Sequence, residues 1–201
     1  YLFAVTNWLV NIIKDQKSRS VQFVARDGYL PMKAYELFKD YFTELPESNY
    51  LYISRKSLCK LDIFSKYDLY SLINKLNIFN SSPKKMYSMF SDYMIIPEEE
   101  LFKKASINNA ISTQNFTSIK AYETFINIFG EYIDFERLNS KKNILRKYFK
   151  NILPPNSIMF DIGYSGRGES ALSNLLGYAV NSVYIHSNSD ILESRMALSG
   201  F

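Results

Sequence analysis

A glycine-rich stretch near the C-terminal end of the sequence carries the clearest chemical signal. It begins at Asp161, contains Gly163, Gly166 and Gly168, and follows a short apolar run. Glycines let backbone N–H groups converge on a ligand because no Cβ obstructs them, and a helix that starts there adds a partial positive charge. The stretch therefore predicts a phosphate site.

Other side chains of the same stretch have chemistry of their own. Ser165 offers a hydroxyl donor, and Arg167 offers a charge that suits a phosphate group. Asp161 is not expected to face the phosphate, because two anions repel each other. We expect its carboxylate to accept hydrogen bonds from hydroxyl groups of the ligand.

Two further stretches place basic residues directly after apolar runs. Arg26 follows the first run, and Arg55 and Lys56 follow the second. If these runs are parallel strands of one sheet, their carboxyl ends meet at one edge, where ligands bind in such sheets. The basic residues would then converge with Arg167 on one cleft. Four cations around a phosphate loop favour a ligand with more than one phosphate group.

Blocks of apolar and polar residues indicate the elements that hold these stretches. Short apolar runs predict strands at residues 21–25, 50–54, 157–161 and 182–185. Helical spacing of apolar residues lies between them and over residues 2–15. This alternation predicts an α/β fold with an open, Rossmann-like parallel sheet and helices on both faces.

The helix after the first strand is defined by a proline and by apolar spacing. Pro31 suits the first turn, where its missing N–H costs nothing. Spacings of three and four residues predict that this helix buries Ala34, Tyr35, Leu37, Phe38, Tyr41 and Phe42.

Residues 60–153 have a different pattern from the rest of the chain. They contain no convincing strand, and breaks at Pro83, Pro97 and Gly130 separate about five helical segments. We therefore expect an α/β core domain of residues 1–59 and 154–201 with a large all-helical insertion of residues 60–153, a hood over the cleft. Because Tyr1 opens directly on a helical pattern and Phe201 ends the chain abruptly, we expect an excerpt of a longer multidomain protein.

Composition excludes several classes of protein. The 201 residues are 47% hydrophobic and 22% charged, which is typical of a globular domain, and a net charge of +4 is too small to favour nucleic acid as a partner. Cys59 and His186 are each alone of their type, so neither a disulfide nor a cysteine-based metal site within the chain is expected. No apolar run reaches the length of a membrane span. We expect a cytoplasmic location, or a peripheral one at the inner membrane.

The glycine-rich stretch resembles that of the type I phosphoribosyltransferases. In that family, a strand ends in two acids and leads into a Thr-Gly-containing loop for a ribose 5-phosphate. Asp161 lies five residues before Gly166, which is the spacing from the second acid to the loop glycine, and Ser165 takes the place of the threonine. Phe160 stands where the family has its first acid.

The chain also resembles the region that follows haloacid-dehalogenase-type phosphatase domains in some bacterial capsule and lipopolysaccharide biosynthesis proteins. Three segments carry this resemblance, at residues 25–29, 54–56 and 161–166. It implies transfer of a 5-phosphoribofuranosyl group from phosphoribosyl diphosphate to a glycan acceptor. A neighbouring phosphatase domain of the same protein would then remove the phosphate.

These resemblances imply roles for individual residues. Asp161 would bind the ribose hydroxyls, and Asp27 would be a second catalytic candidate, as the base that accepts the acceptor's proton. Mg²⁺ would be carried by the diphosphate, with no metal ligands assigned on the chain. The substrate-binding residues would be Gly163, Tyr164, Ser165, Gly166, Arg167, Gly168 and Glu169 at the 5-phosphate, with Glu169 as another candidate base, and Arg26, Gly28, Arg55 and Lys56 at the diphosphate.

Other functions fit these motifs less well. A haloacid-dehalogenase phosphatase needs a nucleophilic aspartate where Ala25 stands. A methyltransferase needs glycines where Ser165 and Arg167 stand. The alternative that stays open is a non-catalytic domain that binds a sugar phosphate or serves as a scaffold attached to a haloacid-dehalogenase-type hydrolase.

Overall fold

The computed structural model describes residues 1–53, 55–58, 60–75, 78–163 and 166–187, without the side chains of residues 55, 56, 74, 75 and 78. The chain forms two compact units. Tyr1–Leu58 and Ile144–Phe201 make up the first unit, and Cys59–Asn143 the second.

The first unit contains a four-stranded, all-parallel open sheet. Its strands are β1 (Ser20–Val24), β2 (Glu47–Leu51), β3 (Ser157–Asp161) and β4 (Asn181–Tyr184), in the order β2-β1-β3-β4. The predicted parallel sheet is therefore confirmed, and β3 has the predicted bounds.

Strand β2 begins three residues earlier than predicted and ends three residues earlier. It lies at the edge of the sheet, and its first four residues alternate between exposed and partly buried. Polar residues such as Glu47 and Asn49 are tolerated in such a strand because one side faces solvent. The first part of β2 therefore lacks the apolar run that predicts a strand from sequence.

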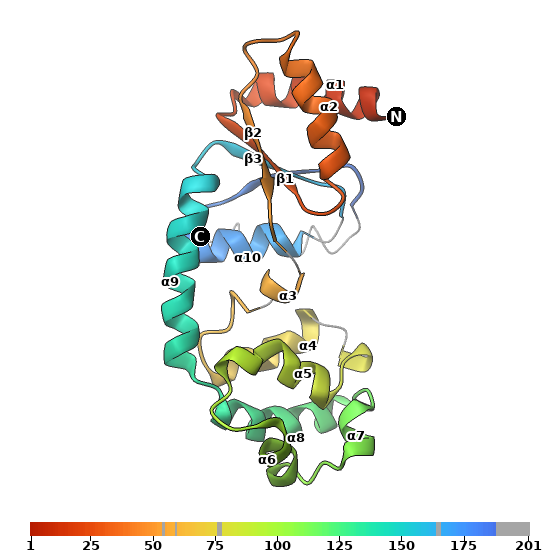
Figure 1. Ribbon diagram of the computed structural model, residues 1–201, viewed down its shortest axis with the longest axis vertical. Coiled ribbons are helices and arrows are strands. Elements are labelled where there is room, and N and C mark those ends of the chain that lie inside the picture. Colours follow the sequence, from red (N-terminus) through yellow and green to blue (C-terminus); the bar gives the residue numbers. More distant parts are fainter. Residues whose placement is uncertain (54, 59, 76–77, 164–165, 188–201) are drawn as a thin grey trace. The chain divides into compact units, whose positions relative to one another are not determined.

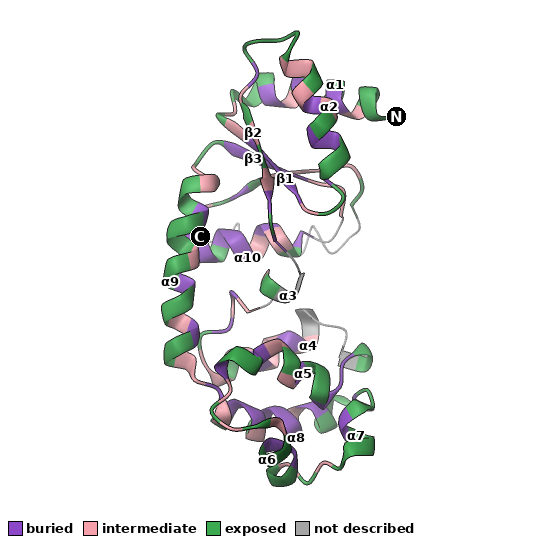
Figure 2. Cartoon of the chain, viewed as in Figure 1, coloured by how far each residue is buried: buried purple, intermediate pink, exposed green. Residues whose placement is uncertain are grey.

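Helices cover both faces of this sheet. Figure 1 shows α1 (Leu2–Gln16) and α2 (Tyr29–Lys39) on one side and α10 (Arg167–Leu176) on the other. Between the sheet and the first pair lies an apolar core made of Leu9, Ile13, Val21, Phe23, Met32, Tyr35, Ile158 and Phe160. Figure 2 shows that β1 and β3, the central strands, are buried along most of their length.

Helix α2 buries fewer residues than its sequence pattern predicts. It has Pro31 in its first turn, as expected, and it buries Tyr35, but Leu37 is 63% exposed. Leu37 comes two residues after Tyr35 and so points to the other side of the helix. Tyr41 and Phe42 are also exposed, because α2 ends at Lys39 and the helical spacing no longer applies to them. The predicted burial of these three residues is wrong.

The second unit is helical in its described residues. Its helices are α4 (Leu72–Lys75), α5 (Pro83–Phe90), α6 (Glu98–Lys104), α7 (Asn109–Thr113), α8 (Ile119–Phe129) and the first part of α9 (Phe135–Ile152), with short 3-10 turns between them. Stacked, tilted and edge-to-face rings of Phe90, Phe116, Phe125 and Phe129 lie in its core. Side chains of Ser82, Asn108 and Ser118 cap three of the helices.

Helix α9 explains why the second unit ends before residue 153, where the expected insertion ended. The helix runs without a break from one unit into the other. Its later part belongs to the first unit, because Arg146 donates a hydrogen bond to the carbonyl of Leu176, and Tyr178 donates one to the carbonyl of Leu153 just beyond the helix. No helix of the described residues is both long enough and apolar enough to cross a membrane.

Stability is expected to fall at alkaline pH because of buried tyrosines. Tyr35 is fully buried, and its hydroxyl donates to the carbonyl of Pro46 at 2.9 Å. Burial raises the pKa of Tyr35 above that of an unfolded chain. The contribution of the Tyr35 hydroxyl to the free energy of unfolding is therefore complete below a pH of about 10. It is lost as the pH rises through the folded-state pKa. In thermal melts, the Tm of Tyr35→Phe should fall less than that of the unchanged protein between roughly pH 9 and pH 12.

The control for this prediction is Tyr41→Phe, since Tyr41 is 84% exposed. This variant should keep the alkaline fall in Tm. An equal fall in the Tyr35→Phe variant and the unchanged protein would contradict the assignment to Tyr35.

Candidate functional site

The order of the strands creates a natural binding position at one edge of the sheet. β1 and β3 are neighbours in the centre, and the chain leaves β1 towards β2 but leaves β3 towards β4. Ligands of open parallel sheets bind at the carboxyl ends of strands where such a divergence occurs. Because Phe23 pairs with Phe160, the ends of β1 and β3 are level. The loops that follow these two strands therefore start side by side (Figure 1).

A tight turn with a required glycine follows β1. The N–H of Gly28 donates to the carbonyl of Val24 at 2.9 Å, which folds the chain back on the strand end. A Cβ at position 28 would lie 2.5 Å from that carbonyl oxygen, so only glycine fits without a shift of the backbone. Arg26 and Asp27 lie exposed on this turn, and α2 begins directly after it.

A second turn follows β3 and leads into α10. The Asp161 carboxylate accepts a hydrogen bond from the N–H of Gly163 at 2.9 Å, a local turn that fixes the orientation of this side chain. Gly166 caps the start of α10 with φ 67° and ψ 0°, in the left-handed region that favours glycine. Tyr164 and Ser165, both expected in the phosphate loop, lie outside the described residues.

The first turn of α10 carries three of the expected residues. Arg167 is exposed and Gly168 is half-buried, whereas Glu169 is only 6% exposed. Tyr184 donates a hydrogen bond to Glu169 Oε2 at 3.2 Å. Burial raises the pKa of Tyr184, and the charge of Glu169 raises it further, so this hydroxyl stays protonated. Glu169 therefore faces Tyr184 within the fold and has little surface left for direct contact with a ligand.

Tyr184 is a residue of this edge that sequence reasoning missed. It pairs with Asp161 in the β3–β4 ladder, and it faces the same side of the sheet. The available signal was the alternation of polar and apolar residues from Ser182 to Ile185, which puts Ser182 and Tyr184 on one face. The alternation indicates the face of the sheet on which Tyr184 lies. It does not indicate its hydrogen-bond partner, because Glu169 belongs to a different element, α10.

The third basic stretch forms the short helix α3 (Arg55–Leu58). Arg55 and Lys56 are on its first turn, and their side chains lie outside the described part of the structure. A Cβ at Gly168 would lie 3.3 Å from the Leu58 side chain, so α3 packs against the start of α10. The backbone thus brings all three predicted stretches to the same region of the first unit.

The two helices that start at this edge differ in the backbone donors they can offer. At α2, the N–H of Gly28 is bonded to Val24, the N–H of Tyr29 donates to the carbonyl of Arg26, and Pro31 has no N–H. At α10, the N-cap is Gly166, which has no side chain to cap the helix, and the first N–H groups of any helix have no partner within the helix itself. The expected anion site at α10 therefore rests on the helix dipole and on the glycine at its start, and an anion near α2 would lie close to the exposed Arg26.

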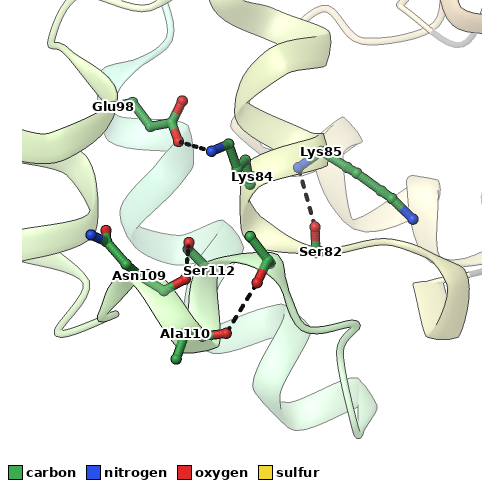
Figure 3. A network of polar contacts seen from close by, with 8 residues as sticks. Ser82, Lys84, Lys85, Glu98, Asn109, Ala110 and Ser112 are labelled. Atoms are coloured by element: carbon green, nitrogen blue, oxygen red, sulfur yellow. Dashed lines mark hydrogen bonds and ion pairs between the residues drawn. The ribbon is translucent and has the colours of Figure 1, made fainter.

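The helical unit has hollows of its own, which differ in character from this edge. One of about 700 Å³ is lined by charged and polar residues. In Figure 3, Lys84 points towards Glu98, and their charged atoms are 3.9 Å apart. Ser82 caps α5, and Ser112 donates to the carbonyl of Asn109 at 2.9 Å. These polar groups pair with one another or close helix ends, so they stabilise the unit itself.

Within the part of the chain that the structure describes, no group of three or more His, Cys, Asp or Glu residues could hold a metal ion. Comparison of the sequence with models of known protein families and with curated proteins gives no match.

The tight turn after β1 predicts a specific effect on stability. Gly28→Ala is expected to lower the free energy of unfolding by about 1–3 kcal/mol, because the added methyl group meets backbone atoms of Val24 that cannot move aside. Gly168→Ala is the control, since its methyl group would meet only the end of the flexible Leu58 side chain. Urea unfolding measures both, and a loss for Gly28→Ala no larger than that of the control would contradict the prediction.

Proposed function

We propose that this chain is a phosphoribosyltransferase-like glycosyltransferase domain. It would move a 5-phosphoribofuranosyl group from phosphoribosyl diphosphate to a hydroxyl of a glycan acceptor. The observation that supports this most is the pairing of β1 with β3, which gathers two glycine-shaped turns and the exposed cations Arg26 and Arg167 at one edge.

The difference between the two helix starts suggests how the two phosphate ends of the substrate would be held. The 5-phosphate would lie at the first turn of α10, where backbone N–H groups and the helix dipole favour an anion. The diphosphate would lie nearer the turn after β1, with Arg26 as its cation and Arg55 and Lys56 of α3 as further partners. Two separate anion positions suit a substrate with a phosphate at each end.

The chemistry requires little covalent work by the protein. The bond from C1 of the ribose to the diphosphate oxygen breaks, and its electron pair leaves with the diphosphate. A bond then forms from the acceptor oxygen to C1, and the acceptor proton passes to a base. Holding both ends of the substrate and stabilising the charge that develops supply the rate enhancement. Asp161, oriented by the Gly163 N–H, would bind the ribose hydroxyls, and exposed Asp27 is the candidate base.

Mg²⁺ carried by the diphosphate would neutralise the charge of the leaving group. Such an ion keeps several waters and takes one or two carboxylates besides the substrate phosphates. No metal ligand is assigned on the chain, and the exposed Asp27 keeps the role of candidate base. The wider context, a neighbouring phosphatase domain in capsule or lipopolysaccharide biosynthesis at the cytoplasmic side of the inner membrane, belongs to the same proposal.

One observation favours the alternative, a non-catalytic domain that binds a sugar phosphate. Phe160, which replaces the first acid of the phosphoribosyltransferase pattern, is fully buried, and its ring lies 5.3 Å from that of Phe23 in the core. Position 160 therefore offers no group to a ligand. A binding domain would keep affinity for the ribose phosphate but would not break the bond at C1.

Binding of the proposed donor is tested by thermal melting. Phosphoribosyl diphosphate with Mg²⁺ should raise the Tm, and S-adenosylmethionine should not, because the turn after β3 suits phosphate. Arg26→Ala should lower the affinity for phosphoribosyl diphosphate roughly tenfold or more, because one charged hydrogen-bond partner is lost. Arg19→Ala is the matched control and should keep the affinity, since Arg19 is exposed at the opposite end of β1. Absence of a shift with any ribose phosphate would overturn the proposal.

Catalysis is tested separately through Asp161→Asn, which keeps an oxygen for the Gly163 N–H but removes the charge. Release of diphosphate from phosphoribosyl diphosphate, with water in place of the glycan, should slow at least about tenfold. Asp40→Asn, an exposed aspartate after α2, should keep the full rate. Unchanged release in the Asp161 variant would remove this residue from the mechanism. Donor binding without any release would instead support the non-catalytic alternative.

A further inference from the structure

Three tyrosines gather beside the turn that follows β1. The ring of Tyr50 packs edge-to-face against Tyr29, with centroids 6.0 Å apart and planes at 84°. It packs in the same way against Tyr52, at 4.9 Å and 89°. We call Tyr29, Tyr50 and Tyr52 the tyrosine cluster.

The cluster is joined to the candidate site by a hydrogen bond. The Tyr50 hydroxyl lies 3.3 Å from the backbone carbonyl of Arg26 and donates to it. Tyr29 opens α2 directly after the Gly28 turn, and Tyr52 comes directly after the last residue of β2. All three residues therefore lie at the same carboxyl edge of the sheet as the proposed donor site.

The cluster leaves a large aromatic surface in contact with water. Tyr52 is 77% exposed and Tyr29 is 49% exposed, whereas Tyr50 is half-buried and held between them. Packing against the core does not require the two outer rings to be tyrosine. Exposed aromatic rings grouped at a ligand-binding edge are a typical means of binding an amphipathic ring, because the ring face attracts C–H groups and the hydroxyl forms hydrogen bonds.

The geometry of the rings favours a sugar over a flat base. Neighbouring rings stand nearly perpendicular, so the cluster offers a corner and not a slot between two parallel faces. A puckered sugar ring has C–H groups on several sides and fits a corner, whereas a base gains most from stacking on parallel faces. Lys33, 5.8 Å from the Tyr29 ring centre, pairs with Glu36 at 2.8 Å, so its charge is neutralised beside that ring.

We propose that the tyrosine cluster binds a sugar ring of the acceptor glycan beside the donor site. That the sugar is the acceptor rests on the proposed function, whereas the binding of a sugar ring rests on the cluster alone. Tyr50 is a positioning residue in this arrangement, since it holds both outer rings and the Arg26 backbone. Tyr52 and Tyr29 contact the sugar.

Saturation-transfer NMR tests this proposal with methyl β-D-galactopyranoside as the probe and adenosine as the flat-ring comparison. We expect transfer from the protein to the C–H protons of the galactoside. Tyr52→Ala should weaken binding by roughly fivefold, the value of one aromatic contact, and Tyr52→Phe should retain most of the binding. Tyr41→Ala is the matched control, because Tyr41 is also largely exposed but lies beyond the other end of α2.

The outcomes separate this proposal from the donor proposal. Galactoside binding that is equal in Tyr52→Ala and Tyr41→Ala, no galactoside binding, or Tyr52-dependent binding of adenosine alone would each overturn the sugar site. The Tm shift with phosphoribosyl diphosphate, measured on the same variants, should persist in Tyr52→Ala. Loss of that shift in every variant, with galactoside binding intact, would refute the proposed donor and leave the sugar site standing.

Discussion

The backbone pairing of β1 with β3 is the constraint on which the rest of the first unit depends. These strands are separated by more than a hundred residues of sequence, yet their ladder is level from Ser20 opposite Ser157 to Phe23 opposite Phe160. Burial of Phe23 and Phe160 in one apolar layer holds this register, since a slip of one residue would turn one of the two rings to the opposite face of the sheet. The turns that contain Gly28 and Gly166 are neighbours only because β1 pairs with β3.

Because of that pairing, two turns of different construction lie next to each other at the carboxyl edge of the sheet. In the turn after β1, the N–H groups of Gly28 and Tyr29 donate to the carbonyls of Val24 and Arg26, and the side chains of Arg26 and Asp27 are exposed. The turn after β3 reaches α10 through Gly166, which lies in the left-handed region and has no side chain of its own to cap the helix. The proposed phosphoribosyl donor, with a phosphate at each end, would be held at this edge by the start of α10 and by the exposed Arg26.

Tyrosine hydroxyls connect these turns to the strands beside them. Tyr50, near the end of β2, holds the backbone of Arg26, and Tyr184, at the end of β4, holds the carboxylate of Glu169. The outer strand β2 thus provides a hydroxyl that fixes the turn after β1, and the outer strand β4 provides one that fixes a side chain of α10. Groups held in this way lose little further freedom when a ligand binds, and that lowers the cost of binding.

The sequence by itself determined the features that depend on local chemistry. These are the glycines of both turns, the bounds of β3, Pro31 in the first turn of α2 and the parallel class of the sheet, because propensity and spacing act within a few residues. The tertiary structure alone decided the strand order, the edge position of β2, the exposure of Leu37, the burial of Glu169 and the hydroxyl contacts of Tyr50 and Tyr184. Each of these depends on contacts between residues far apart in the chain, which the pattern of a single segment does not contain.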